Sequence, residues 1–129
     1  MKILGHGIDL VSVSRMREIL ERQGEAFRAK VFTPEERQYC ERLADPAVHF
    51  AARFAAKEAF AKASGLGMMG SGALSNGVEV KHHSDGRPYL AFSEEVSKRL
   101  KSMGGKDHFV SITHDGDLAM VSVILVGEA

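Results

Sequence analysis

The sequence has few of the features that mark secreted, membrane-bound or nucleic-acid-binding proteins. Its 129 residues include one cysteine, Cys40, so no intramolecular disulfide can form and a reducing cytoplasm is the expected compartment. The 17 basic residues are balanced by 17 acidic ones, whereas a general nucleic-acid binder carries a clustered cationic surplus. No apolar run approaches the roughly 18 residues that a membrane-spanning helix needs. We therefore expect a cytoplasmic protein that binds neither nucleic acid nor membrane.

Several familiar motifs are also missing. The sequence has no G-x-S-x-G nucleophile motif, no zinc-ligand spacing and no Walker A loop. No internal repeat, low-complexity segment or linker divides the chain, and this length is typical of one domain. Met1 leads straight into a strand-like segment instead of a charged and then apolar leader, so we expect no signal peptide. Residues 1–129 are predicted to form a single domain.

The elements predicted from local patterns mix strands and helices without strict alternation. Apolar runs indicate strands, and capping residues mark the starts of helices. "TPEE", for example, is a capping box with proline at the first helical position, and "DPAV" is expected to start the next helix in the same way. The expected strands are 3–11, 78–83, 89–92, 108–114 and 118–126, and the expected helices are 15–22, 34–43, 46–64 and 94–103. This order favours an α+β fold over a doubly wound sheet. The glycine-rich stretch 65–77 is expected to be a mobile or functionally shaped loop.

The helix predicted over residues 46–64 carries one residue that does not fit its surroundings. This helix is rich in alanine and ends at Gly65, a typical C-terminal cap. On a helical wheel Glu58 lies beside Phe54 and alanines, where a carboxylate has little access to bulk solvent. The simplest interpretation is a helix-stabilising pair with Lys62 at i,i+4, worth about 0.3–0.5 kcal/mol. That pair would not explain the apolar setting.

A second carboxylate supports another interpretation. Asp9 lies inside the predicted strand "GIDLV", where an acid is costly to bury unless it is paired or bound to a metal. Two carboxylates suit Mg²⁺, which uses few protein ligands and completes its octahedron with water and substrate phosphate. Lys62, one turn after Glu58, could reach phosphate oxygens. Asp9 and Glu58 together predict a metal–phosphate site.

Two further segments could contribute to such a site. Gly65 leaves its backbone amide open to close approach by a ligand. "SITHD", residues 111–115, places hydroxyl groups and His114 at the end of a predicted strand. His114 could equally be an ordinary loop histidine.

Four motifs occur in an order that is typical of one family. They are "GIDLV", "RFAAKEAFAKASGLG", "DGRPYL" and "SITHD", and together they span nearly the whole chain. In this combination the sequence resembles the bacterial holo-acyl-carrier-protein synthases, the short-chain members of the phosphopantetheinyl transferase superfamily. Ser12 departs from the family pattern, in which many relatives carry an acidic residue, but this exchange affects no candidate metal ligand.

The resemblance implies a fold and a reaction. The fold would be an antiparallel sheet packed with a long central helix. The enzyme would transfer 4'-phosphopantetheine from coenzyme A to a serine of apo-acyl carrier protein in fatty acid biosynthesis, with Mg²⁺ as cofactor and adenosine 3',5'-bisphosphate as the second product. Asp9 and Glu58 would hold the metal, and Lys62 would act with them in catalysis. The implied coenzyme A-binding residues are Lys62, Gly65, Thr113 and His114.

The resemblance also implies protein partners. Family members of this length are homotrimers with active sites between subunits. Acyl carrier proteins are acidic, and the region after the first predicted strand is basic, as a docking surface for them would be. The candidate docking residues are Arg15, Arg22 and Arg28, of which Arg15 best matches the docking position of the family. For any one of them a solvated helix face is an equally good explanation.

The residues alone leave two other classes of function open. One is an unrelated Mg²⁺-dependent phosphohydrolase that uses Asp9 and Glu58. The other is a small oligomeric binding module in which the pair Glu58–Lys62 is only structural. The general base for the acceptor serine is open as well, between a metal-bound water and one of the carboxylates.

Overall fold

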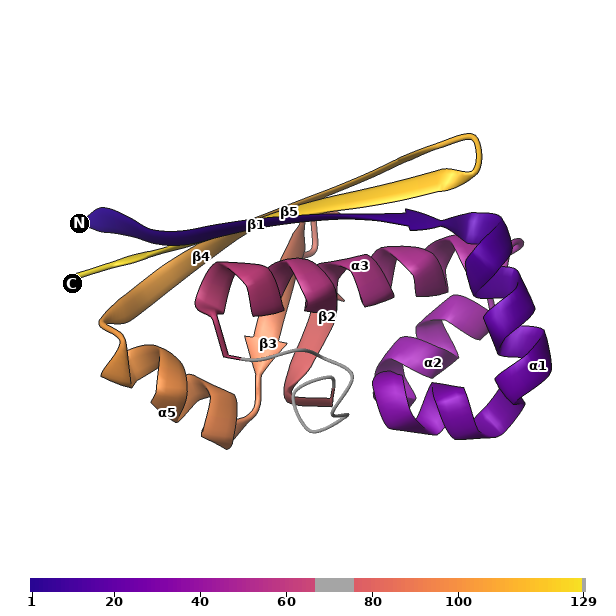
Figure 1. Cartoon of the computed structure of the whole chain (residues 1–129), viewed down its shortest axis with the longest axis horizontal. Helices are drawn as coiled ribbons and strands as arrows, with labels where there is room; N and C mark the ends of the chain where they lie inside the picture. Colours follow the sequence, from indigo (N-terminus) through magenta and orange to yellow (C-terminus); the bar gives the residue numbers. More distant parts are fainter. Residues whose placement is uncertain (67–75, 129) are drawn as a thin grey trace.

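A three-stranded antiparallel sheet lies along one side of the molecule, and the helices lie on its other side (Figure 1). The computed structural model describes residues 1–66 and 76–128. The sheet has the order β1-β5-β4, with β1 at Lys2–Ser12, β4 at Gly105–Asp115 and β5 at Leu118–Gly127. A separate hairpin consists of β2 (Val78–His82) and β3 (Pro88–Phe92). The helices are α1 (Val13–Val31), α2 (Pro34–Glu41), α3 (Pro46–Ser64) and α5 (Glu94–Ser102). The predicted α+β fold with a long central helix is confirmed.

The central helix α3 lies between the sheet and the hairpin because its residues are small. Its buried side chains include Ala55, Ala56, Ala59 and Ala63, which pack with valines of β2 and β5. Two glycines of β1 permit the closest approach. A Cβ atom on Gly5 would lie 1.8 Å from the carbonyl oxygen of Ala63, and one on Gly7 would lie 1.9 Å from that of Ala59. This contact holds the second half of α3 directly against β1.

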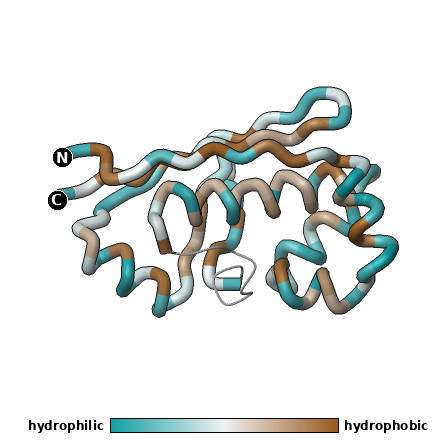
Figure 2. The backbone as a smooth tube through the Cα atoms, viewed as in Figure 1, coloured by the Kyte–Doolittle hydropathy of each residue, from teal (hydrophilic) through white to brown (hydrophobic). Residues whose placement is uncertain are grey.

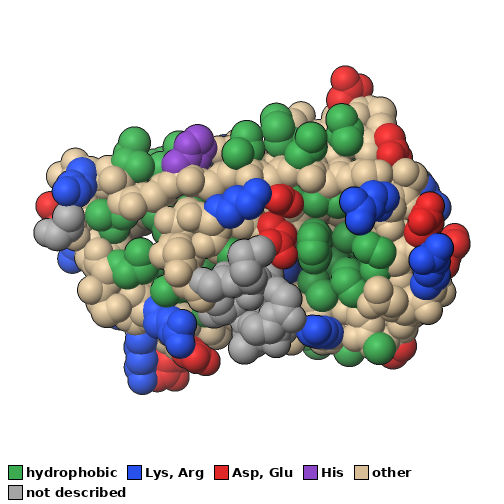
Figure 3. All heavy atoms as spheres, in the orientation of Figure 1, with side chains coloured by type: hydrophobic (Ala, Val, Ile, Leu, Met, Phe, Trp, Pro, Cys, Tyr) green, Lys and Arg blue, Asp and Glu red, His purple; other side chains and the backbone are tan. Residues whose placement is uncertain are grey.

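The two faces of the sheet differ in exposure. Side chains alternate along each strand, and the inward set of β5 is buried against α3. The outward set includes several large apolar side chains that are exposed, and Figure 3 shows a row of hydrophobic side chains along this edge of the molecule. In Figure 2 apolar residues recur along these strands, with polar residues between them. The large exposed members are Ile3, Ile8, Leu10, Phe109, Leu118 and Met120.

The end of the first helix and the cap of α3 differ from the sequence prediction. The helix expected to end at Arg22 continues as α1 to Val31, across a kink at Gly24, whose φ is 56°. It continues because Val31 is buried in the core formed with α2 and α3. The predicted start of α3 at Pro46 is confirmed, but the Asp45 side chain forms no capping hydrogen bond. Its carboxylate instead binds Arg17 at 2.9 Å.

The capping box before α2 is confirmed and has a second role. The Thr33 hydroxyl accepts from the Glu36 N–H, and Glu36 accepts from the Thr33 N–H. Glu36 is fully buried and binds the buried ammonium of Lys57 on α3 at 2.8 Å, and it also accepts from the Val80 N–H. This ion pair joins α2, α3 and β2. Among the described residues, no helix is long and apolar enough to cross a membrane.

Candidate active site

Asp9 and Lys62 meet where β1 crosses α3. The Lys62 ammonium donates to Asp9 Oδ1 at 3.1 Å and to the carbonyl oxygen of Ile8 at 3.0 Å. The Asp9 side chain is 17% exposed and that of Lys62 is 51% exposed. Lys62 therefore pairs with an acid from a different element and not with Glu58, so the simple i,i+4 pair is not what the chain forms.

Glu58 lies one helical turn before Lys62 and shares a hollow with Asp9. Burial, followed by the nearby Asp9 carboxylate, raises the pKa of Glu58 above its ordinary value, and Lys62 opposes this rise. The hollow has a volume of about 350 Å³. Arg15 and Ser12 also line it, together with apolar side chains of β1, α1 and α3. The two acids predicted to act together are therefore neighbours in space.

The acidic pair is open to a metal ion but does not surround one. Within residues 1–66 and 76–128, no three His, Cys, Asp or Glu side chains gather so as to hold a metal. A two-carboxylate set agrees with the few protein ligands that Mg²⁺ uses. Burial first, and the Asp9 carboxylate second, raise the pKa of Glu58, and a bound cation would favour its charged form.

Gly65 ends α3 as predicted. It adopts the left-handed conformation, with φ 69° and ψ 14°, and its N–H donates to the Ala61 carbonyl at 2.9 Å. It therefore follows Lys62 by less than one turn at the end of the same helix. Most of the glycine-rich stretch predicted to form a loop, residues 67–75, lies outside the described residues.

Thr113 and His114 lie away from the acidic pair. In the register of the sheet, Asp9 pairs with Val121, and Thr113 pairs with Met120. Val121 is fully buried against α3 and Met120 is exposed, so Thr113 projects from the outer face of the sheet while Asp9 lies on the inner face. His114 lies on β4, the edge strand opposite β1. One chain alone does not bring these two residues to Asp9.

His114 instead lies near a cluster of basic side chains at the start of α3. Burial lowers the pKa of His49, and the positive charges of Arg53 and His114 lower it further. Arg53 is 3% exposed, and its guanidinium lies 4.3 Å from the centroid of the Tyr39 ring. The His82 ring stacks on the Tyr39 ring, with 5.3 Å between the two centroids.

Arg53 is a candidate binding residue to which no motif in the sequence assigns a role. Its Nη1 donates to the His49 carbonyl at 3.4 Å, while its buried Nε has no hydrogen-bond partner among the described residues. A buried cation with an unused donor is a candidate contact for an anion. The signal in the sequence is an arginine that opens the apolar run "RFAAKEAF", but helical patterning alone does not separate it from a solvated residue.

Residues 5–118 match the family model of the 4'-phosphopantetheinyl transferase superfamily. The chain belongs to this superfamily. It is 41% identical to the holo-[acyl-carrier-protein] synthase of Koribacter versatilis, over 95% of this chain and 98% of the relative. It is 42% identical to that of Syntrophus aciditrophicus, over 95% of each.

Solved structures of such synthases share the fold. The crystal structure from Neisseria meningitidis has a TM-score of 0.88 at 32% identity and covers 97% of this chain and 99% of its own. A complex with coenzyme A from Chronobacterium ammoniagenes has a TM-score of 0.85 at 31% identity and covers all of both chains. The phosphopantetheinyl transferase fold predicted from the four motifs is confirmed.

The candidate docking arginines of this transferase differ in their surroundings. Arg15 is exposed at the rim of the hollow that holds Asp9 and Glu58. Arg22 is exposed further along α1. Arg28 is partly buried, and its guanidinium donates to the Leu20 carbonyl at 3.1 Å and pairs with Glu41 at 3.5 Å. Those contacts stabilise the segment after the Gly24 kink, so Arg28 has a structural task that Arg15 lacks.

Proposed function

We propose that this chain transfers 4'-phosphopantetheine from coenzyme A to a serine of apo-acyl carrier protein. The serine hydroxyl oxygen forms a new bond to the phosphorus next to the pantetheine, the pyrophosphate bond breaks, and adenosine 3',5'-bisphosphate leaves. The serine proton is released. The observation that supports this function is that Asp9 and Glu58 line one hollow and Lys62 binds Asp9, in a chain similar to holo-acyl-carrier-protein synthases along its length.

The acidic pair suits a magnesium ion. Asp9 and Glu58 would hold Mg²⁺, which would neutralise the charge that develops on the pyrophosphate as its bond breaks. The burial that raises the pKa of Glu58 lowers the local dielectric, so a charge placed there acts strongly. The Lys62 ammonium is half exposed and stands beside Asp9, where it would contact the same phosphates.

We further infer that a second copy of this chain completes the active site. Thr113 projects from the outer sheet face, which also carries the exposed apolar residues Leu10, Phe109 and Met120. Packing this face against other copies would bury it and would bring Thr113 of one subunit toward Asp9 of the next. His114 pairs with the buried Ala119 and so lies on the inner face of the sheet. By family resemblance the assembly is a homotrimer.

The oligomer is tested by light scattering on the purified protein. Three copies of the 14.0 kDa chain are expected. Phe109→Lys should lower this mass, since it places a charge in the proposed interface, whereas Lys98→Glu on α5 should not. A monomeric protein with full activity would exclude the shared site.

The carrier protein would dock on α1. Arg15 lies at the rim of the hollow, where an acidic carrier would approach with its serine directed at the acidic pair. The proposed partners are thus coenzyme A and apo-acyl carrier protein, with fatty acid biosynthesis as the pathway and the cytoplasm as the compartment. We propose that residues 1–129 act as one domain in this reaction.

The deciding experiment is the intact mass of an apo-acyl carrier protein after incubation with this protein, coenzyme A and Mg²⁺. Phosphopantetheinyl transfer adds the mass of that group to the carrier. A phosphohydrolase would release phosphate and leave the carrier unchanged, and a binding module would change neither coenzyme A nor the carrier. Asp9→Asn and Glu58→Gln should each abolish transfer, and Glu21→Gln, an exposed acid on α1, should not.

A further inference from the structure

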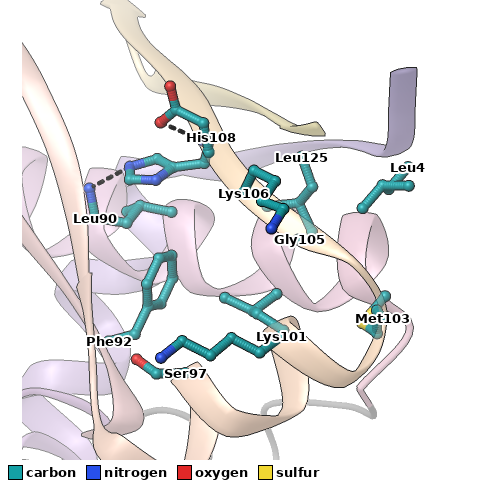
Figure 4. A pocket seen from close by; sticks show the side chains of 12 residues that line it. Leu4, Leu90, Phe92, Ser97, Lys101, Met103, Gly105, Lys106, His108 and Leu125 are labelled. Atoms are coloured by element: carbon teal, nitrogen blue, oxygen red, sulfur yellow. Dashed lines mark hydrogen bonds between the residues drawn. The ribbon is translucent and has the colours of Figure 1, made fainter. Parts of the chain in front are cut away.

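A second cavity lies between α5, β3 and β4, apart from the candidate active site (Figure 4). Its volume is about 300 Å³, the lower end for small-molecule sites. Leu4 on β1 lines it, and this residue lies roughly 17 Å along the strand from Asp9 at about 3.4 Å per residue. Its apolar lining consists of Leu4, Leu90, Phe92, Leu100, Met103 and Leu125.

The apolar wall is fixed by contacts behind it. The Phe92 ring packs on Phe60 at 5.2 Å, and the His108 ring meets it edge-on at 5.3 Å. His108 is itself held, because its Nε2 accepts from the Leu90 N–H at 3.0 Å. A cavity whose wall is held in this way needs little reorganisation to accept a ligand.

Two lysines border this apolar space. Lys101 extends along the cavity from α5 toward the Ser97 hydroxyl, and Lys106 reaches it from β4 (Figure 4). In the described part of the chain, neither ammonium lies within 4 Å of a carboxylate. Lys98 on the same helix differs, since it pairs with Glu94 at 3.3 Å. The one carboxylate that also borders the cavity, that of Asp107, accepts from the His108 N–H at 2.7 Å.

We propose that this cavity binds a medium-chain aliphatic carboxylate, with its alkyl chain on the leucines and its carboxylate between Lys101 and Lys106. The apolar wall offers no hydrogen-bond partners for a sugar or a base, whereas a saturated chain needs none. Two lysine ammonium groups without a carboxylate partner select an anionic head over a neutral or cationic one. This site does not depend on the proposed transferase function.

The test uses three compounds with one chain and different heads: octanoate, octan-1-ol and octyltrimethylammonium. Titration calorimetry should show saturable binding of octanoate, weaker binding of octan-1-ol and no binding of the cation. Within the carboxylates, affinity should rise about fourfold for each added methylene until the cavity is full. Absence of saturable octanoate binding, or equal binding of the cation, overturns the proposal.

Substitutions in the cavity between α5, β3 and β4 test whether octanoate binds there. The double variant K101M/K106M should lose about tenfold or more of its octanoate affinity and keep its affinity for octan-1-ol. Lys98→Met, the matched control on α5, should change neither the affinity for octanoate nor that for octan-1-ol. Ser97→Leu should weaken the binding of both octanoate and octan-1-ol, because the larger side chain narrows the cavity. If this variant does not fold, the lysine variants provide the test of the site. Octanoate binding that is unchanged in K101M/K106M contradicts the site.

Discussion

Lys62→Met separates a structural role of this lysine from a role in phosphoryl transfer. Its ammonium donates to Asp9 Oδ1 at 3.1 Å and to a backbone carbonyl at 3.0 Å, and half of its side chain is exposed. An ion pair with this exposure contributes about 0.2–1 kcal/mol to stability. Loss of a charge that acts on phosphate in the transition state costs about 1.4–4 kcal/mol of transition-state stabilisation. The rate should therefore fall by roughly tenfold to a thousandfold, with little change in melting temperature.

The measurement is carrier modification under saturating Mg²⁺ and coenzyme A, beside thermal unfolding of the same preparations. Lys98→Met is the control, because it removes an exposed ammonium that pairs with a carboxylate at 3.3 Å on a helix away from the acidic pair. A Lys62→Met protein that unfolds at the wild-type temperature and works at the wild-type rate would refute the role in catalysis. In that case the contact with Asp9 would serve only to join β1 to α3.

Four further outcomes follow from the same geometry. Glu58→Gln should unfold at an equal or higher temperature than wild type in magnesium-free buffer, because burial and the Asp9 carboxylate disfavour the negative charge that this substitution removes. A clear loss of stability would show that the charge of Glu58 is not unfavourable in the folded protein. Lys57→Met should cost about 3–5 kcal/mol in urea unfolding, because it leaves Glu36 buried and unpaired, and adding Glu36→Leu should recover part of this loss. Burial lowers the pKa of His108 in the folded protein. As the pH falls through about 6.5, the unfolded chain therefore binds a proton at this histidine before the folded protein does. The contribution of His108 to the free energy of unfolding is complete above about pH 7 and declines below that pH. Unfolding free energies measured from pH 8 to 5 should decrease, and an increase would contradict this sign. Arg15→Glu should raise KM for the carrier far more than KM for coenzyme A, and equal changes would remove Arg15 from the docking surface.

Local patterns were sufficient for most of the secondary structure. Capping residues act within one turn, so the capping box at Thr33 and the N-cap at Ser93 could be predicted without tertiary information. Strand alternation and the turn residues between strands are equally local. The prediction was wrong where a distant contact decided the outcome. Burial of Val31 carries α1 past Gly24, and the ion pair with Arg17 takes the Asp45 side chain away from the cap.

In the candidate site, too, local sequence features predicted some residues and tertiary packing decided their partners. Glu58 and Asp9 could be selected from the sequence because a carboxylate in an apolar setting needs a partner, wherever that partner is. Which groups meet depended on three-dimensional packing. Gly5 and Gly7 admit α3 onto β1, so Lys62 pairs with Asp9 from the strand and not with Glu58 on its own helix.

The sequence by itself determined the fold class, the caps of α2 and α5, the family and the choice of the two candidate acids, because each of these follows from a short-range pattern or from the order of motifs. The tertiary structure alone decided that Thr113 projects from the far side of the sheet, since a shift of one residue along a strand reverses the face. It also decided that Arg53 is buried beside Tyr39 and that Lys57 finds Glu36. Charged side chains on α3 look alike in a sequence, and only the neighbours that packing supplies tell them apart.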